Sequence, residues 1–187
     1  MTIENIVLTP QPLSKDAFAP FGDVIAVDNG NAPIMINEGT TERFHKLATV
    51  ELNGKQQFDG AQQAQSIISI FRAQPRSLPM PITMMERHPL GSQAFLPSDN
   101  DPYLVLVCLG EDAPNPETLK LFVAKGEGVN YSANTWHHPL LALDKVSNFW
   151  IVDRAGQGNN LEEQNFSSEL KIEIPSDLVA ACIEGMK

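Results

Sequence analysis

The sequence predicts an all-β fold, a sandwich or a barrel, with a few short helices. Apolar runs of four to eight residues recur at close spacing along the 187 residues. Fourteen prolines and 12 glycines separate these runs, and long helical patterns are scarce. Short strands divided by turn residues are typical of all-β domains. Length and the absence of an internal repeat or long linker predict a single domain over residues 1–187.

Seven segments are expected to form strands because they are apolar or alternate with period two. Within residues 118–124, Leu119, Leu121 and Val123 show that alternation most clearly. The glycines of the turn at residues 125–130 tolerate the backbone of a tight reversal. The expected strands are Ser66–Ala73, Ile82–His88, Ser92–Pro97, Pro102–Leu109, Thr118–Ala124, Leu140–Leu143 and Asn148–Arg154.

Two short helices are expected, one near each end of the chain. Residues 13–22 offer Ser14 as an N-cap, with Asp16 in the first turn. Residues 175–187 offer Ser176 or Asp177 as a cap, followed by apolar positions at helical spacing. The segments at residues 111–118 and 155–165 are expected to be loops, because proline, glycine and asparagine are frequent in them.

Charge and composition restrict the partners. The formal net charge of −10 predicts that neither nucleic acid nor an anionic membrane is a partner, because little positive charge faces phosphates. Residues 1–18 lack a basic region followed by an apolar core, and no apolar run approaches the roughly 20 residues of a membrane span. Cys108 and Cys182 are expected to be reduced thiols. The predicted location is the cytoplasm.

Polar side chains gather at the ends of the expected strands. In an extended strand Glu86 and His88 share one face, and Arg87 points to the other. By the same alternation only one of His137 and His138 faces the interior. We expect that one to be His137, opposite His88. A surface ion pair of Glu86 with a neighbouring arginine remains an alternative to a functional role.

The sequence resembles the ureidoglycolate lyase family of the cupin superfamily. The segment GEGVNYSANTWH is similar to the second cupin motif, and ERHPLGSQAF to a degraded first motif. The blocks SIFRAQPR, MERHPLGSQAFLP, GVNYSANTWHHPLLAL and FWIVDRAG carry the closer resemblance, which extends from about Leu8 to Glu163. It implies a cupin-like double-stranded β-helix, that is, a jelly-roll barrel. It also implies a homodimer and cleavage of (S)-ureidoglycolate to glyoxylate and urea in allantoin degradation.

That reaction needs a base for the hydroxyl proton, a proton donor for the leaving urea and a cation for the carboxylate. Histidine and glutamate suit the proton roles, and arginine suits the carboxylate. We therefore predict His88, His137 and Glu86 as catalytic residues, without deciding which is base and which is acid. The predicted substrate-binding residues are Arg72, Gln93, Arg87 and His138. Arg72 and Arg76 could alternatively be ordinary charges on the rim of the barrel.

A metal is a further option that the residues leave open. Many cupins hold a divalent ion with three histidines and a glutamate, and members of the resembled family are associated with nickel. Here the corresponding set would be Glu86, His88, Gln93 and His137, in which a neutral amide is a weaker ligand than a carboxylate. The elimination does not strictly require a metal, because arginine and histidine can supply the positive charge.

Three other readings remain open at this point. A different cupin enzyme, such as a metal-dependent dioxygenase or an isomerase, would bind iron or manganese and release no urea. A ureidoglycolate amidohydrolase would release ammonia. A non-catalytic cupin would bind a carboxylate without turnover. The predicted partner is a small carboxylate substrate in each case.

Overall fold

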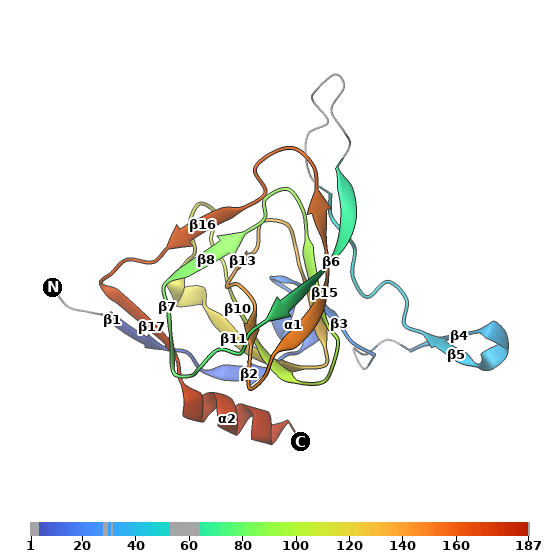
Figure 1. Cartoon of the computed structure of the whole chain (residues 1–187), viewed down its shortest axis with the longest axis horizontal. Coiled ribbons are helices and arrows are strands. Elements are labelled where there is room, and N and C mark those ends of the chain that lie inside the picture. Colours follow the sequence, from blue (N-terminus) through green and yellow to red (C-terminus); the bar gives the residue numbers. More distant parts are fainter. Residues whose placement is uncertain (1–3, 28–29, 31, 53–63, 187) are drawn as a thin grey trace.

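A computed structural model describes residues 4–27, 30, 32–52 and 64–186 and confirms the all-β, jelly-roll-like prediction. Two β-sheets face each other, and a smaller sheet with a helix covers the outer side of one of them (Figure 1). None of the described helices is long and apolar enough to cross a membrane.

The middle layer is a seven-stranded sheet with β10 and β11 at its centre. Its strand order is β16 (Glu162–Asn165), β8 (Met84–Arg87), β13 (Trp136–His137), β10 (Pro102–Cys108), β11 (Lys120–Lys125) and β2 (Pro10–Pro12), and β14 (Leu141–Ala142) also pairs with β10. The alternation seen in the sequence places Leu121 and Val123 on one face and Phe122 and Ala124 on the other. Both faces are buried, so β10 and β11 read as nearly continuous apolar runs.

The facing layer is a five-stranded sheet that forms one wall of the site. Its order is β3 (Gly22–Ile25), β12 (Gly128–Tyr131), β9 (Gln93–Pro97), β15 (Ser147–Ala155) and β6 (Gln65–Ala73). Phe95, Phe149 and Ile151 from this sheet pack against Val105 and Phe122 from the middle layer. This aromatic-rich core holds the two sheets together and leaves β6 as an edge strand.

The third layer covers the other face of the middle sheet. It comprises a three-stranded sheet of β1 (Glu4–Val7), β17 (Leu170–Ile174) and β7 (Met80–Ile82), together with the C-terminal helix α2 (Ser176–Gly185). Ile172, Ile174 and Val179 pack against Leu104 and Leu121 in a second core cluster. The predicted C-terminal helix therefore closes this core, and Figure 1 shows it beneath β2.

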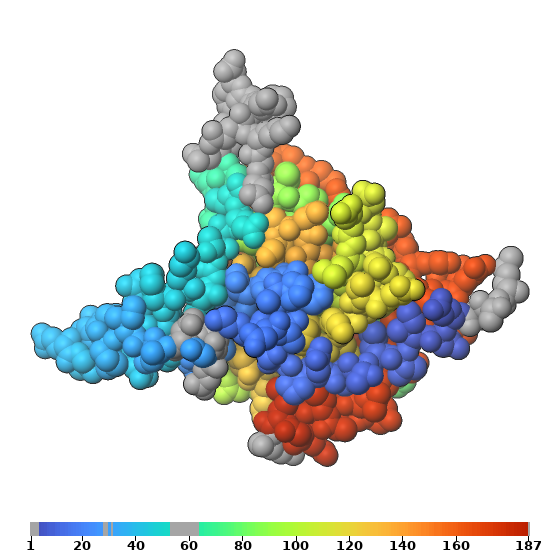
Figure 2. Space-filling model, turned by 180° about the vertical axis from the view of Figure 1, so that it is seen from behind, coloured from blue at the N-terminus to red at the C-terminus, as the bar shows by residue number. Residues whose placement is uncertain are grey.

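Shorter elements complete the described chain. Helix α1 (Lys15–Phe18) buries Phe18 in the core between the two large sheets. The hairpin of β4 (Ile34–Ile36) and β5 (Thr41–Arg43), joined by the 3₁₀ turn η1 (Asn37–Gly39), extends away from the three layers in both views (Figures 1 and 2). A second 3₁₀ turn, η2 (Pro116–Thr118), lies before β11.

Several element predictions are confirmed to within two residues, namely those that became β6, β9, β10, β11, β14 and β15. The single strand expected over Ile82–His88 is wrong. The chain breaks at Thr83, so that β7 joins the outer sheet and β8 joins the middle sheet. The change of sheet matters for the site because β8, and not β7, carries the polar residues. The expected cap of α2 is also wrong, because Pro175 occupies the N-cap position.

The loops expected over residues 111–118 and 155–165 contain regular structure, because η2 occupies part of the first and β16 part of the second. Strand β16 is polar, and only its pairing with β8 identifies it as a strand. Strands β1, β2, β3, β4, β5, β12 and β17 were likewise not predicted. The one-domain prediction over residues 1–187 stays a prediction, since part of that range lies outside the described residues.

Candidate functional site

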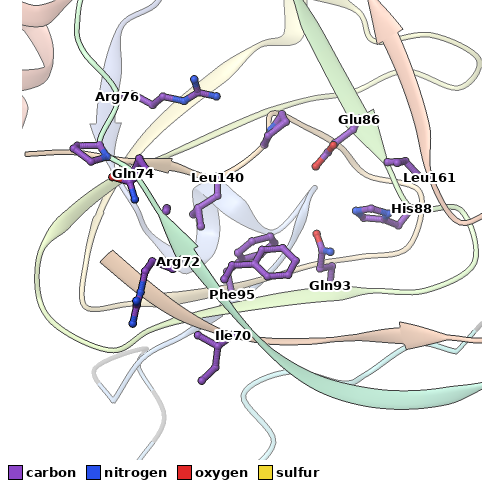
Figure 3. A pocket seen from close by; sticks show the side chains of 14 residues that line it. Ile70, Arg72, Gln74, Arg76, Glu86, His88, Gln93, Phe95, Leu140 and Leu161 are labelled. Carbon is purple, nitrogen blue, oxygen red and sulfur yellow. The ribbon is translucent and has the colours of Figure 1, made fainter. Parts of the chain in front are cut away.

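An open pocket of about 770 Å³ lies where the ends of β8 and β9 face the end of β6. In Figure 3, Glu86, His88 and Gln93 stand on one side of it, and Arg72 and Arg76 stand on the other. Phe95 and Leu140 lie between the two groups. The pocket is lined by Ile70, Phe71, Arg72, Ala73, Gln74, Pro75, Arg76, Glu86, His88, Gln93, Phe95, Pro139, Leu140 and Leu161.

Glu86 and His137 are directly opposite each other on neighbouring strands. The pairing of β8 with β13 sets Glu86 against His137, and the two side chains share the face that looks toward the five-stranded sheet. His137 is only 1% exposed, and its Nε2 lies 3.5 Å from Glu86 Oε1. Tyr131 stacks on its ring with centroids 4.2 Å apart. His137 thus lies behind Glu86, and Glu86 faces the pocket.

The orientation of the His137 ring is fixed by its other nitrogen. Nδ1 lies 2.9 Å from the carbonyl oxygen of Thr135. Because a carbonyl only accepts hydrogen bonds, Nδ1 carries a proton and donates it. Nε2 is therefore the ring nitrogen that points at the Glu86 carboxylate, and it does so without a hydrogen bond of good geometry.

His88 is held in the same way. Its Nδ1 donates to the carbonyl oxygen of Asn160 at 2.6 Å, and the side chain of Asn160 accepts from the amide of Leu90 at 2.7 Å. The two contacts fasten the segment after β8 to the loop before β16. The His88 ring lies 5.3 Å from the His137 ring, centroid to centroid. Its buried Nε2 has no hydrogen-bond partner within the described residues.

A glycine allows the turn between His88 and Gln93 to pack tightly. A Cβ at Gly91 would lie 2.7 Å from the Cβ of Arg154 and 3.1 Å from the carbonyl oxygen of Glu51. The first distance is shorter than real Cβ contacts allow, so a larger residue would displace the turn. Gly91 therefore helps to bring the ends of β8 and β9 together at the pocket.

The electrostatics separate the protonation states of Glu86 and His88. Burial opposes ionisation of Glu86, but the contact with His137 and the charges of the neighbouring histidines outweigh it and lower the Glu86 pKa. Burial is also the largest effect on His88, followed by the charge of His137, and together they lower the His88 pKa. At neutral pH the pocket therefore holds an ionised Glu86 and a neutral His88.

Gln93 connects this cluster to a carboxylate on the neighbouring strand. Its amide lies near enough to Asp153 to oppose the rise in pKa that burial causes there, and near enough to His88 to favour the charged ring. Its Oε1 is buried and makes no hydrogen bond of good geometry within the described residues. In Figure 3 that oxygen points toward the space between Glu86 and His88.

Electron-pair donors thus converge on one small space. One ligand atom each from Glu86, His88 and His137 lie within 4.8 Å of one another. Both rings donate Nδ1–H to a backbone carbonyl, which is the arrangement that orients Nε2 for a metal. The residues present therefore fit a divalent cation with two imidazoles and a carboxylate.

The two arginines of the pocket differ in their surroundings. Arg72 pairs with Asn148 across β6 and β15, and its Nε donates to the Asn148 side chain at 2.9 Å. The guanidinium of Arg76 has no hydrogen bond or ion pair in the part of the chain that the structure describes. Its charge is near enough to lower the pKa of His138, for which burial is the larger cause. Arg76 is the more available of the two for an anionic ligand.

The structure does not bring Arg87 to the pocket. Strand alternation turns it to the outer face of the middle sheet, where its guanidinium lies 4.4 Å above the ring of Trp136. It also forms an ion pair with Glu162 at 2.6 Å. Neither Arg87 nor Arg154 pairs with Glu86, so the alternative of a surface ion pair for Glu86 does not apply to the described structure.

His138 is buried, and it does not line the pocket. Its Nδ1 donates to the carbonyl oxygen of Pro139 at 2.8 Å, and its backbone amide donates to Leu106. Both adjacent histidines are buried, and strand β13 ends at His137, so alternation does not fix the direction of His138.

Three residues of the site were not predicted as such: Tyr131, Asp153 and Arg76. Asp153 lies in a segment predicted as an ordinary strand, and Tyr131 lies in β12, which was not predicted. Only the pairing of these strands places the two residues beside Gln93 and His137. Arg76 was considered only as a rim charge. Its position in the block SIFRAQPR, four residues after Arg72, was the available signal.

Comparison with known proteins identifies one family over most of the chain. The family model described as ureidoglycolate lyase matches residues 5–173. A protein named ureidoglycolate lyase from Brucella melitensis biotype 2 is 52% identical over 169 residues, covering 89% of this chain and 93% of its own. Proteins of the same name from Brucella anthropi and Pseudomonas fluorescens are 50% and 46% identical, covering 89% and 88% of this chain and 93% and 95% of their own.

Proposed function

This chain belongs to the ureidoglycolate lyase family, and we propose that the pocket beside Glu86 and His88 is where it cleaves ureidoglycolate. The chain is a carbon–nitrogen lyase that converts ureidoglycolate to glyoxylate and urea. The observation that carries the assignment of the pocket is the pairing of an ionised Glu86 and a neutral His88 with two arginines across one cavity.

The reaction releases no net proton, and the groups in the pocket suit that balance. The hydroxyl proton leaves as the carbonyl of glyoxylate forms. The electron pair of the breaking carbon–nitrogen bond goes to nitrogen, which must gain one proton to become urea. At neutral pH both Glu86 and His88 accept protons and neither donates one. The proton delivered to nitrogen is therefore the one just taken from the hydroxyl.

His88 is the better carrier of that proton. A catalytic base works best when its pKa is near the operating pH, and the ordinary histidine pKa of 6.5 is closer to neutrality than the ordinary glutamate pKa of 4.5. Its Nδ1–H is already donated to Asn160, so Nε2 receives the proton. The Glu86 carboxylate stabilises the imidazolium while it exists, and His137 Nε2 lies behind Glu86, 3.5 Å from its Oε1.

The substrate carboxylate binds at the arginine side of the pocket. Arg76 is the primary partner because its guanidinium is free within the described residues, and Arg72 is secondary because Asn148 engages its Nε. A guanidinium holds a carboxylate with two parallel charge-assisted hydrogen bonds. Binding at this side directs the ureido end of the substrate toward Glu86, His88 and Gln93. The contacts that Arg87 and His138 make with Glu162 and Pro139 support structural roles for both.

A divalent metal is compatible with the same residues. Glu86, His88 and His137 would hold it, with Gln93 as a further neutral oxygen ligand. When bound, such an ion would act as a Lewis acid on an oxygen of the substrate. Nickel and manganese both accept imidazole and carboxylate ligands. In the absence of a metal, His88 keeps the proton role and the arginines keep the carboxylate role described above.

A homodimer is part of this proposal. The outer face of the five-stranded sheet carries Ile68, Ile70 and Trp150, which are 73%, 57% and 48% exposed. Trp150 is directly opposite Ile70 in the pairing of β15 with β6, and Ile68 lies one pair further along the same face. Exposed apolar surface of this kind marks an interaction site. Ile70 and Arg72 also border the pocket, so a second copy on this face would lie beside its mouth.

The biological setting follows from the same activity. We place the chain in the cytoplasm and in allantoin degradation, where it would use the (S)-enantiomer of ureidoglycolate. The partner is the small carboxylate substrate, with no nucleic acid or membrane involved. The charge of −10 supports this, because only a local pair of arginines faces an anion.

One product assay tests the proposed function. The purified protein is incubated with racemic ureidoglycolate, and urea, glyoxylate and ammonia are measured together. Equal amounts of urea and glyoxylate are expected, up to half of the racemate, with no ammonia. Ammonia with carbon dioxide would instead identify an amidohydrolase. Binding without any product would identify a non-catalytic protein.

A further inference from the structure

We propose that Asp153 is a positioning residue that holds the Gln93 amide with its oxygen toward the pocket, so that Gln93 accepts a hydrogen bond from a ureido N–H of the substrate. The proposal rests on the proposed function for the identity of the ligand. The contact between the two residues is tested separately from it.

The sheet register brings the two side chains together. Strands β15 and β9 are antiparallel, with Val152 opposite Ala94, so the next pair in the same register is Asp153 and Gln93. On the other side Gln93 is opposite Tyr131. All three side chains therefore lie in one row on the face that looks toward the middle sheet. Directly opposed side chains in an antiparallel pair have Cβ atoms about 5 Å apart, which is close enough for a carboxylate to meet an amide.

The chemistry of the pair decides which end of the amide faces the pocket. Oδ1 of Asp153 is buried and has no hydrogen-bond partner in the described structure, and a carboxylate oxygen accepts hydrogen bonds, so the Gln93 amide is best placed with its N–H groups toward Asp153. The amide oxygen is then turned away from Asp153, and it is buried without a good partner in the described structure. Figure 3 shows that oxygen directed toward Glu86 and His88.

The orientation selects for hydrogen-bond donors on the ligand. A ureido group offers three N–H donors, and Glu86 and Gln93 both present acceptors to the cavity. If the Gln93 amide were turned the other way, its N–H groups would face the N–H groups of the ureido group, and buried donors on both sides would lack acceptors. Sites built to pair with a particular polar group discriminate strongly against ligands that lack it. Asp153 thereby contributes to the selection of a urea leaving group without touching it.

Exchanging the two side chains tests the contact. Gln93→Glu alone sets two carboxylates against each other, so we expect urea to inhibit about tenfold more weakly and the thermal midpoint to fall. Adding Asp153→Asn restores a donor to the position opposite, because the introduced asparagine can donate to the introduced carboxylate. In the double variant we expect inhibition by urea within about threefold of the wild type, and recovery of most of the lost midpoint.

The matched control removes a carboxylate elsewhere. Asp101 is the half-buried partner of the exposed Lys145 and does not line the pocket, and Asp101→Asn in the Gln93→Glu background changes net charge by the same amount. We expect Asp101→Asn to restore neither the thermal midpoint nor inhibition by urea. Inhibition by glyoxylate, which binds at the arginine side, should change less than about threefold in every variant. Comparing inhibition by glyoxylate with inhibition by urea separates a role at the ureido end of the pocket from a general loss of structure.

Two results would overturn the proposal. One is additivity, in which Asp153→Asn rescues neither the midpoint nor inhibition by urea in the Gln93→Glu background. The other is rescue by Asp101→Asn to the same extent. The thermal midpoints need no substrate, so they test the contact even if the wild type releases no urea from ureidoglycolate. That latter outcome would reject the proposed function alone.

Discussion

His137 Nε2 lies 3.5 Å from Glu86 Oε1, while Nδ1 of the same ring donates to the carbonyl oxygen of Thr135. The carboxylate at the pocket therefore faces a ring whose orientation the backbone has already fixed. The same device orients His88 through Asn160. The proton is carried at a centre made of two imidazoles, each with one ring nitrogen left free by the backbone, and the carboxylate of Glu86, whose pKa is lowered.

Neutralising Glu86 should slow turnover strongly and leave the fold intact. Glu86→Gln removes the charge that stabilises the His88 imidazolium, so we expect kcat to fall by about 10²–10⁴-fold. KM should change much less, because the substrate carboxylate binds at Arg76. Urea release measured across substrate concentrations gives both values. Glu117→Gln, at an exposed turn away from the pocket, is the control and should match the wild type. A Glu86→Gln enzyme with more than a third of the wild-type kcat would contradict the assignment.

The stability of the fold should decline on mild acidification. Burial is the largest cause that lowers the pKa values of His88 and His138 from 6.5, so the folded state binds fewer protons than the unfolded state below that value. The contribution of the two histidines to the free energy of unfolding is fully present above about pH 6.5. It is lost as the pH falls through their pKa values in the folded state. The lowered pKa of Glu86 adds a further loss below about pH 4.5.

Urea unfolding at several pH values measures this decline. The free energy of unfolding should fall as the pH is lowered below 6.5, and His138→Asn should flatten the fall, because the asparagine keeps a donor for the Pro139 carbonyl but does not titrate. His45→Asn, at an exposed position beside Arg43, should leave the slope unchanged. Equal slopes in the wild type and His138→Asn would show that His138 does not titrate as proposed.

Much of the site follows from strand alternation, and the rest depends on strand pairing. Alternation alone places Glu86 on the pocket face of its strand and Arg87 on the opposite face, as found. It does not reveal that β7 and β8 separate at Thr83, because the apolar pattern continues across the break. The partnership of Asp153 with Gln93 joins residues 60 positions apart in the sequence through the register of β15 and β9. Arg72 and Arg76 differ only through the contact with Asn148, which the sequence does not encode locally.

The histidine and glutamate cluster should bind a divalent ion tightly enough to measure. We expect chelator-treated protein to take up one Ni²⁺ or Mn²⁺ per chain in calorimetry, because three oriented ligands converge within 4.8 Å. His88→Ala should weaken that binding by at least about tenfold. His45→Ala removes a histidine outside the pocket and should not. Uptake that is equally strong in His88→Ala would place the ion elsewhere.

Whether the ion takes part in turnover is a separate measurement. Activity is compared before chelation, after chelation and after the ion is restored. Loss and recovery of kcat in step with occupancy would assign the ion to the working enzyme. Unchanged activity in the stripped protein would assign proton transfer to His88 and carboxylate binding to the arginines alone.

The two arginines should contribute unequally to substrate binding. Arg76→Ala is expected to raise KM by roughly 10–100-fold, because a free guanidinium bound to a carboxylate contributes about 1.5–3 kcal/mol. Arg72→Ala should raise it less, since Asn148 already occupies one donor. Arg87→Ala is the matched control, as it removes the same charge outside the pocket. If Arg72→Ala had the larger effect on KM, the assignment of the primary anchor would be reversed.

The apolar face of β6 and β15 should hold two copies together. Ile68→Asp or Trp150→Asp places a charge where Ile68, Ile70 and Trp150 would otherwise be buried, and the desolvation of that charge opposes association. We expect light scattering to give twice the chain mass for the wild type and the single-chain mass for either variant. Val146→Asp changes an exposed apolar residue that is not in this row, so that variant should remain a dimer.

Because Ile70 and Arg72 border the pocket, dissociation should also raise KM, as the substrate would then bind beside an uncovered edge strand. A Trp150→Asp variant that stays dimeric would assign the interface to another surface, and a monomer with wild-type KM would separate the dimer from the pocket.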